Sequence, residues 1–251
     1  MSAQFYVSPE QMMKDRADFA RKGIARGKSV VVMSYADGIA LVAENVSPTL
    51  HKIGEIYDRI GFAAVGKYNE FESLRQAGVR YADVRGYSYD RADVSARGLA
   101  SVYAQSLGTV FTTEQKPFEV ELAVAEVSDA QIHDHIFRIN FDGSISEESG
   151  YLCMGGQAEN VAAKLAELWV PETDIAQALA WAVTALQSPH QAPVADAERT
   201  ESNAVPLGLG AATLEVAVLE RNAKEIRGTH RTFRRLSAAD VATFLPSNRQ
   251  D

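Results

Sequence analysis

The stretch Gly27-Lys28-Ser29 places a glycine just before a Val-rich run, which is where a hydrolase that uses its N-terminal residue would cut its own chain. Nucleophilic catalysis needs an activated Ser, Thr, Cys or Lys with a base within reach. The residue freed by such a cut would be Lys28, and Ser29 lies one position too late. Glu44 and Lys52 are of suitable types to assist, but no nucleophile stands at the required place. We therefore expect no catalytic residue.

A second pattern, GFAAVGK from Gly61 to Lys67, nearly matches the phosphate-binding loop G-x-x-x-x-G-K-[ST]. The following residue is Tyr68, which lacks the compact hydroxyl that holds Mg²⁺. The residues between the glycines are apolar and typical of a strand. We expect Gly66 to end a strand and Lys67 to open a helix, with no nucleotide bound.

His133-Asp134-His135 would place two histidines on one side of a strand, as some metal sites require. No third ligand is evident nearby, so a polar surface turn before a strand is the favoured interpretation. Cys153, the only cysteine, lies in an apolar run and is expected to be a small buried hydrophobic residue without a disulfide partner. We expect no metal and no cofactor.

These residues are positioned by an N-terminal helix, predicted over residues 10–26. Ser8 is a good N-cap, Pro9 suits the first helical position and Gln11 occupies the capping-box position. Gly27 is a natural stop after the helix. One apolar stripe runs along it, formed by Met13, Ala17, Ala20 and Ile24. This stripe fits packing on the same domain or against a neighbouring subunit.

The remaining elements alternate between runs of strands and runs of helices. Asp37-Gly38 predicts a hairpin between two of the strands. We expect strands at 29–35, 39–44, 52–56, 60–65, 118–127, 135–141, 151–154, 211–220 and 229–233. We expect helices at 67–86, 92–112, 160–169, 175–186 and 237–245, with Thr173 a candidate cap of the fourth. Residues 188–206, rich in proline and polar residues, are expected to form a mobile loop.

This order predicts an α+β protein with two stacked sheets between helical layers, in a single domain spanning residues 1–251. The net charge of −8 argues against a nucleic-acid binder, although residues 1–28 are locally basic. No signal peptide and no membrane-spanning run is evident, so the chain is expected to be cytoplasmic.

Taken together, these segments resemble the α subunit of the proteasome core particle, of the actinobacterial type. The resemblance spans nearly the whole chain and rests on the order and spacing of six segments: Ser8-Pro9-Glu10, Ala20–Gly27, Ala36-Asp37-Gly38, Lys52–Gly66, Tyr87–Arg91 and Met154-Gly155-Gly156.

The resemblance implies the four-layer αββα sandwich of N-terminal-nucleophile hydrolases, with an extra N-terminal helix. It implies a non-catalytic subunit whose seven-membered rings cap proteolytic β rings, gate the entry of unfolded protein substrates and dock a hexameric ATPase through its C-terminal tails. The gating segment would be residues 1–9, with the gate formed by Gln4, Phe5, Tyr6, Val7, Ser8 and Pro9. The activator pocket would use Lys52 and Gly27, since an ammonium can pair with a chain-terminal carboxylate.

Two departures from the wider family concern the gate and the pore. The Tyr-Asp-Arg that precedes Ser-Pro in archaeal and eukaryotic relatives is replaced here by Gln4-Phe5-Tyr6-Val7. The Tyr-Gly-Gly of archaeal pore constrictions is replaced before Pro117 by Thr112–Gln115. The alternative functions are a free-standing N-terminal-nucleophile hydrolase, which Lys28 opposes, and a nucleotide binder, which Tyr68 opposes.

Overall fold

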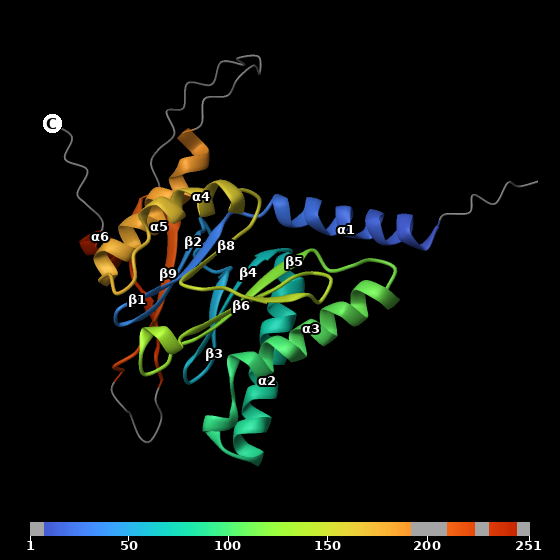
Figure 1. Ribbon diagram of the computed structural model, residues 1–251, viewed down its shortest axis with the longest axis horizontal. Helices are drawn as coiled ribbons and strands as arrows, with labels where there is room; N and C mark the ends of the chain where they lie inside the picture. Colours follow the sequence, from blue (N-terminus) through green and yellow to red (C-terminus); the bar gives the residue numbers. More distant parts are fainter. Residues whose placement is uncertain (1–7, 192–209, 224–230, 245–251) are drawn as a thin grey trace, which may run out of the picture.

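Two five-stranded antiparallel sheets face each other in the computed structural model, which describes residues 8–191, 210–223 and 231–244 (Figure 1). Sheet A has the order β10-β9-β2-β1-β8 and consists of β1 (Val30–Tyr35), β2 (Gly38–Glu44), β8 (Tyr151–Met154), β9 (Leu214–Glu220) and β10 (Phe233–Leu236). Sheet B has the order β3-β4-β5-β6-β7 and consists of β3 (Ile53–Tyr57), β4 (Ile60–Gly66), β5 (Val120–Glu126), β6 (His135–Ile139) and β7 (Ile145–Glu147).

Helices cover the outer face of each sheet. On sheet B lie α2 (Tyr68–Ser88) and α3 (Ala96–Thr113), and on sheet A lie α4 (Ala158–Leu168) and α5 (Ile175–Gln191) (Figure 1). The short helix α6 (Ala238–Phe244) packs beside α5, and single 3₁₀ turns occur at Arg91–Asp93, Gln131–His133 and Ala211–Thr213. The αββα architecture predicted from the sequence is therefore confirmed.

Strand sequences explain this layering, because successive side chains point to opposite faces of a strand. In β1, Val30 and Val32 join the cluster between the two sheets, whereas Val31 and Met33 pack under α4 and α5. Both faces of β1 and β2 are buried, so these strands are apolar apart from Ser34 and the terminal Glu44. The hairpin at Ala36-Asp37 pairs Tyr35 with Gly38, as predicted.

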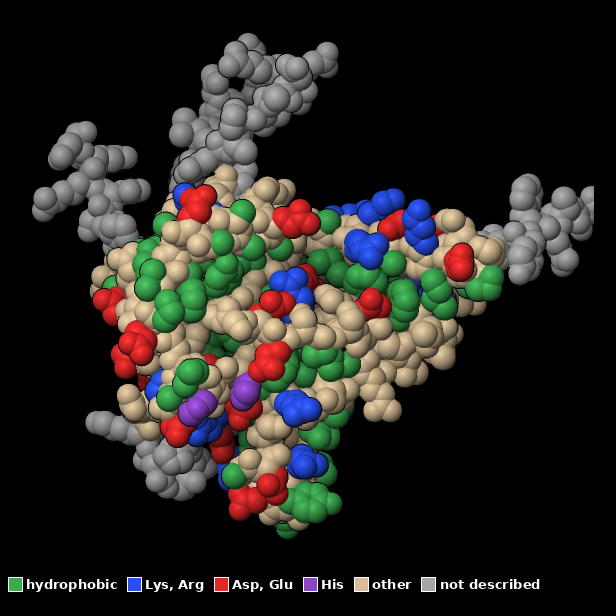
Figure 2. All heavy atoms as spheres, viewed as in Figure 1, with side chains coloured by type: hydrophobic (Ala, Val, Ile, Leu, Met, Phe, Trp, Pro, Cys, Tyr) green, Lys and Arg blue, Asp and Glu red, His purple; other side chains and the backbone are tan. Residues whose placement is uncertain are grey.

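Helix α1 (Pro9–Ala25) projects from the open end of the sandwich (Figure 1). The Ser8 hydroxyl accepts a bond from the Gln11 N–H, which confirms the cap, while the Gln11 side chain binds Asp15 and not the cap. Only Ala20 and Ile24 of α1 are buried. Lys and Arg side chains gather along α1 on the face shown in Figure 2, beside exposed hydrophobic side chains, and Met12, Met13 and Phe19 remain exposed. The apolar stripe is thus buried only toward its C-terminal end.

Several predicted boundaries were wrong. Asp174, and not Thr173, accepts a hydrogen bond from the Gln177 N–H at the start of α5. That helix runs on through residues 188–191, which were predicted to belong to a mobile loop; residues 192–206 lie outside the described part. At the edge of sheet A, β9 pairs with residues 233–236; of the predicted strand 229–233 only Phe233 belongs to this strand, and residues 229 and 230 lie outside the described part. The GFAAVGK stretch forms β4, as expected for a strand rather than a phosphate-binding loop.

Candidate functional site

Three charged side chains meet where α1 ends and β1 begins. Lys28 lies in the link between the two elements, Glu44 ends β2 and Lys52 directly precedes β3. The Lys28 ammonium lies 2.9 Å from Glu44 Oε1. The Lys52 ammonium donates to the Lys28 carbonyl oxygen at 2.9 Å. The antiparallel pairing of β1 with β2 places Glu44 beside the start of β1, because Ala43 is paired with Val30.

The half-buried ammonium of Lys52 is electrostatically perturbed. Burial lowers the pKa of this group to about 8, an effect that neighbouring Lys28 reinforces, while Glu44 and Glu215 act to raise it. A lysine in such a place is still charged at neutral pH, yet part of its hydration is gone. It is therefore suited to bind an incoming anion such as a carboxylate.

Glu215, a buried carboxylate on β9, holds the backbone around Lys52. Its oxygens accept hydrogen bonds from the N–H groups of Lys52 at 2.9 Å and Ile53 at 3.2 Å. The side chains of Asn45, His51 and Arg235 also contact it. This residue was missed in the sequence, where the only signal was a charge inside the apolar run of β9.

Gly27 brings α1 close to sheet B. A Cβ atom at this position would lie 2.4 Å from Val65 Cγ1 and 3.3 Å from the Gly66 nitrogen, so only glycine fits. The Gly27 N–H donates to the Ile24 carbonyl at 2.8 Å. Gly27 thus contributes space and not a free donor. Lys52 and Gly27 are the two residues predicted for the activator pocket. They lie close together because the Lys52 ammonium binds the carbonyl of Lys28, the residue that follows Gly27.

The two ammonium groups of this cluster suit it to binding an anion. Glu44 and Lys52 occupy positions beside Gly27, as an N-terminal-nucleophile site would need. The residue that follows Gly27 is Lys28, whose ammonium is engaged by Glu44. Helix α1 ends at Ala25, so the chain reaches Lys28 through a short link formed by Arg26 and Gly27, and Ser29 is buried. The positions around a nucleophile are present, but a lysine stands at the central one.

The predicted gate residues lie at the other end of α1. Ser8 and Pro9 are the cap and first residue of the helix. At 1.5 Å of rise per residue, the 17 residues of α1 separate them from Gly27 by about 25 Å. Gln4, Phe5, Tyr6 and Val7 lie outside the described residues. The predicted gate residues and the cluster around Lys52 therefore lie at opposite ends of α1.

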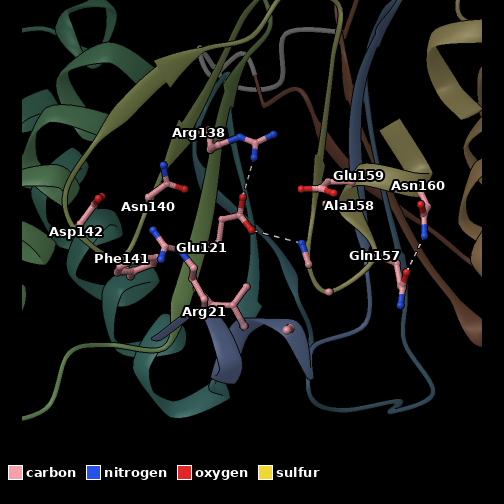
Figure 3. Close-up of a pocket in the computed structure, with 14 residues that line it drawn as sticks. Arg21, Glu121, Arg138, Asn140, Phe141, Asp142, Gln157, Ala158, Glu159 and Asn160 are labelled. Atoms are coloured by element: carbon pink, nitrogen blue, oxygen red, sulfur yellow. Dashed lines mark hydrogen bonds and ion pairs between the residues drawn. The ribbon is translucent and has the colours of Figure 1, made fainter. Parts of the chain in front are cut away.

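Apart from the cluster around Lys52, a pocket of about 550 Å³ lies beside the last turns of α1 (Figure 3). Its floor carries Glu121, which accepts from Arg138 at 3.1 Å and from the Gly155 N–H at 3.3 Å. Burial raises the pKa of Glu121, and Arg138 opposes this. Arg138 also donates to the Cys153 carbonyl at 3.1 Å. These contacts join sheet B to the end of sheet A, and sequence reasoning missed them.

The segment His133-Asp134-His135 contributes a buried ion pair through its aspartate. His133 and His135 are exposed, as predicted for a surface turn, but the Asp134 side chain is only 2% exposed. Asp134 pairs with Arg221, which is 7% exposed, and accepts from Ser34 Oγ at 2.6 Å. This pair links the two sheets near the hairpin of β1 and β2.

Cys153 is 2% exposed, and burial raises the pKa of its thiol to about 12, in agreement with the expected inert residue. Within residues 8–191, 210–223 and 231–244, no cluster of three His, Cys, Asp or Glu side chains suits a metal ion. In the same part of the chain, no helix has the length and apolar character needed to cross a membrane.

Comparison with known proteins gives a consistent result. The family model described as proteasome subunit matches residues 24–201. The chain is 64% identical over 245 residues to the proteasome subunit alpha of Pseudarthrobacter chlorophenolicus, covering 98% of this chain and 100% of that relative. It is 63% identical to the subunit of the same name from Renibacterium salmoninarum, covering 98% and 96%. It is 58% identical to that of Kineococcus radiotolerans, covering 98% of both chains.

Proposed function

The chain belongs to the proteasome subunit family, as an α-type subunit of the core particle, and on this basis we propose that it forms the gated, activator-docking ring of that particle. Seven copies would form a ring, and each ring would cap a ring of proteolytic β subunits. Unfolded protein substrates would pass through the pore of the α ring in ATP-dependent degradation. We place this particle in the cytoplasm, with no nucleic-acid or membrane partner.

The observation that carries the proposal is the cluster of Lys28, Glu44 and Lys52 at the end of α1. It supports a non-catalytic role, because a lysine paired to a carboxylate stands where a nucleophile would be required. It supports docking, because the Lys52 ammonium lies against the Gly27-Lys28 backbone and can pair with a chain-terminal carboxylate. The tail of a hexameric ring ATPase supplies such a carboxylate.

Gating is assigned to residues 1–9 because they precede the rigid helix that also ends at the docking site. A tail bound beside Gly27 could shift α1 as a unit and so displace Ser8 and Pro9. The exposed Met12, Met13 and Phe19 on α1 are suited to packing against a neighbouring copy in the ring.

The docking site and the gate are tested separately in particles assembled from this chain and the β-type subunit of the same organism. Lys52→Ala should weaken docking of that organism's ring ATPase while leaving hydrolysis of a tripeptide substrate nearly unchanged. Equal ATPase affinity in mutant and parent would refute the docking assignment. Deletion of residues 2–7 should raise hydrolysis of long peptides, and unchanged rates would refute the gate.

The alternative is a free-standing N-terminal-nucleophile hydrolase. It predicts a mature chain that begins internally at Thr or Ser and hydrolyses peptides without a partner. Intact mass of the purified chain, together with a peptidase assay in the absence of β subunits, separates the two functions. We expect a chain that retains α1 and shows no activity alone.

A further inference from the structure

We propose that Glu215 is the positioning residue of the docking site: it holds the backbone at residues 52 and 53 so that the Lys52 ammonium faces the Gly27-Lys28 link. This inference rests on the proposed function, because it concerns how Lys52 is prepared to receive the carboxylate of an activator tail.

The first argument is the geometry of the carboxylate. The Glu215 side chain is 6% exposed, and both of its oxygens are used. Oε2 accepts from the Lys52 N–H at 2.9 Å and from Asn45 Nδ2 at 2.7 Å, while Oε1 accepts from the Ile53 N–H at 3.2 Å. Two consecutive backbone donors on one carboxylate fix the direction in which the Lys52 side chain leaves the chain.

The second argument is that this hold crosses between the two sheets. Glu215 belongs to β9 in sheet A, whereas residues 52 and 53 enter β3 in sheet B. Arg235 of β10 binds Glu215 and donates to the Ile53 carbonyl at 2.7 Å. Sheet A therefore holds the N–H groups of Lys52 and Ile53 and the Ile53 carbonyl, while the Lys52 carbonyl accepts from the Ala64 N–H of β4 at 3.0 Å. A surface lysine on an otherwise free loop would have no such support.

The third argument is electrostatic. The charged groups that face Lys52 are Glu44 from β2, Glu215 from β9 and Lys28 from the link before β1. His51 and Arg235 contact Glu215 on its other sides. Burial lowers the pKa of Lys52 to about 8, and Glu44 and Glu215 limit that fall. Without the charge of Glu215, less of the ammonium would be protonated at neutral pH.

The test compares Glu215→Gln with the parent in the assembled α–β particle. The probe is a fluorescein-labelled peptide with the last ten residues of the organism's ring ATPase, and its affinity is measured by anisotropy from pH 6.5 to 9.5. The matched control is Glu220→Gln, which changes a carboxylate at the far end of the same strand, where it binds Arg234.

We expect Glu215→Gln to move the midpoint of the affinity profile to lower pH. Affinity at pH 7.5 should fall with it, because less of Lys52 is then in the charged form that binds a carboxylate. Glu220→Gln should leave the profile unchanged. A profile that keeps its midpoint in Glu215→Gln, with or without a uniform loss of affinity, would overturn the inference.

A second variant covers the case in which Glu215→Gln does not assemble. Arg235→Gln keeps the Glu215 carboxylate but removes its ion pair with Arg235 and the bond to the Ile53 carbonyl, so affinity should fall at every pH. Unchanged affinity in this variant would refute the positioning role. Lys52→Ala tests the docking site itself, which is refuted if this variant binds the peptide with the affinity of the parent. If Lys52→Ala weakens binding but the Glu215 and Arg235 variants do not behave as expected, only the role of Glu215 is refuted.

Discussion

The pH dependence of tail binding is the most direct consequence of the site around Lys52. The perturbation is a rise from pH 7 to pH 9, across which the ordinary lysine pKa of 10.5 would leave the side chain charged. In this protein burial lowers the pKa of Lys52 to about 8, and Glu44 and Glu215 only partly oppose the shift. The charged form binds a carboxylate, so affinity should be nearly full at pH 7, halved at about pH 8 and further reduced at higher pH.

The magnitude follows from the titration. With a pKa of about 8, Lys52 is about nine-tenths charged at pH 7 and about one-tenth charged at pH 9. The affinity of the peptide should therefore fall about tenfold over this range, which corresponds to about 1.4 kcal/mol. A lysine of ordinary pKa would lose only a few per cent of its charge. The two cases are readily separated.

The assay is anisotropy of the labelled tail peptide on the assembled particle, at constant ionic strength because salt screens exposed charges. Lys52→Arg is the control, since a guanidinium stays charged throughout and should give a flat profile. The same peptide with a C-terminal amide should bind weakly at every pH. A parent profile that is flat between pH 7 and pH 9 would refute the reasoning, because the ammonium would then not titrate in this range.

Two further predictions concern stability, each measured by urea unfolding of the purified chain. Asp134→Asn should destabilise by about 3 kcal/mol, because it leaves Arg221 buried beside a neutral group; Asp129→Asn, at an exposed carboxylate, should have no measurable effect. Gly27→Ala should destabilise by about 1–3 kcal/mol by pushing α1 away from β4. In contrast, Gly108→Ala has space inside α3 and should stabilise by roughly 0.5–1 kcal/mol. Loss of stability at Asp129 or unchanged stability at Gly27 would contradict these assignments.

Elements with strong local signals could be predicted from the sequence. The Ser8 cap and the hairpin before Gly38 depend on neighbouring residues only, and both are present. The weaker predictions concern segments whose state depends on distant partners. Strand β7 was missed because its three residues are exposed and gain their pairing only from β6. The β10 strand was placed too early, since its position is decided by register with β9.

Some features of the candidate site could likewise be predicted from the sequence, and others could not. The identity of Lys28 after Gly27 is a property of the sequence, and it alone excludes a nucleophile at that position. The choice of Lys52 and Gly27 came from family resemblance and not from local chemistry. Glu215 lies 163 residues from Lys52 along the chain, and no periodicity or motif connects them.

The sequence by itself therefore determined the order of the elements apart from β7, the capped helix α1 and the lysine that follows Gly27, because these follow from residue type and local spacing. Only the tertiary structure decided which charges surround Lys52. The packing of sheet A against sheet B brings Glu44 and Glu215 to it and removes water from its ammonium, and both effects depend on contacts between strands far apart in the chain.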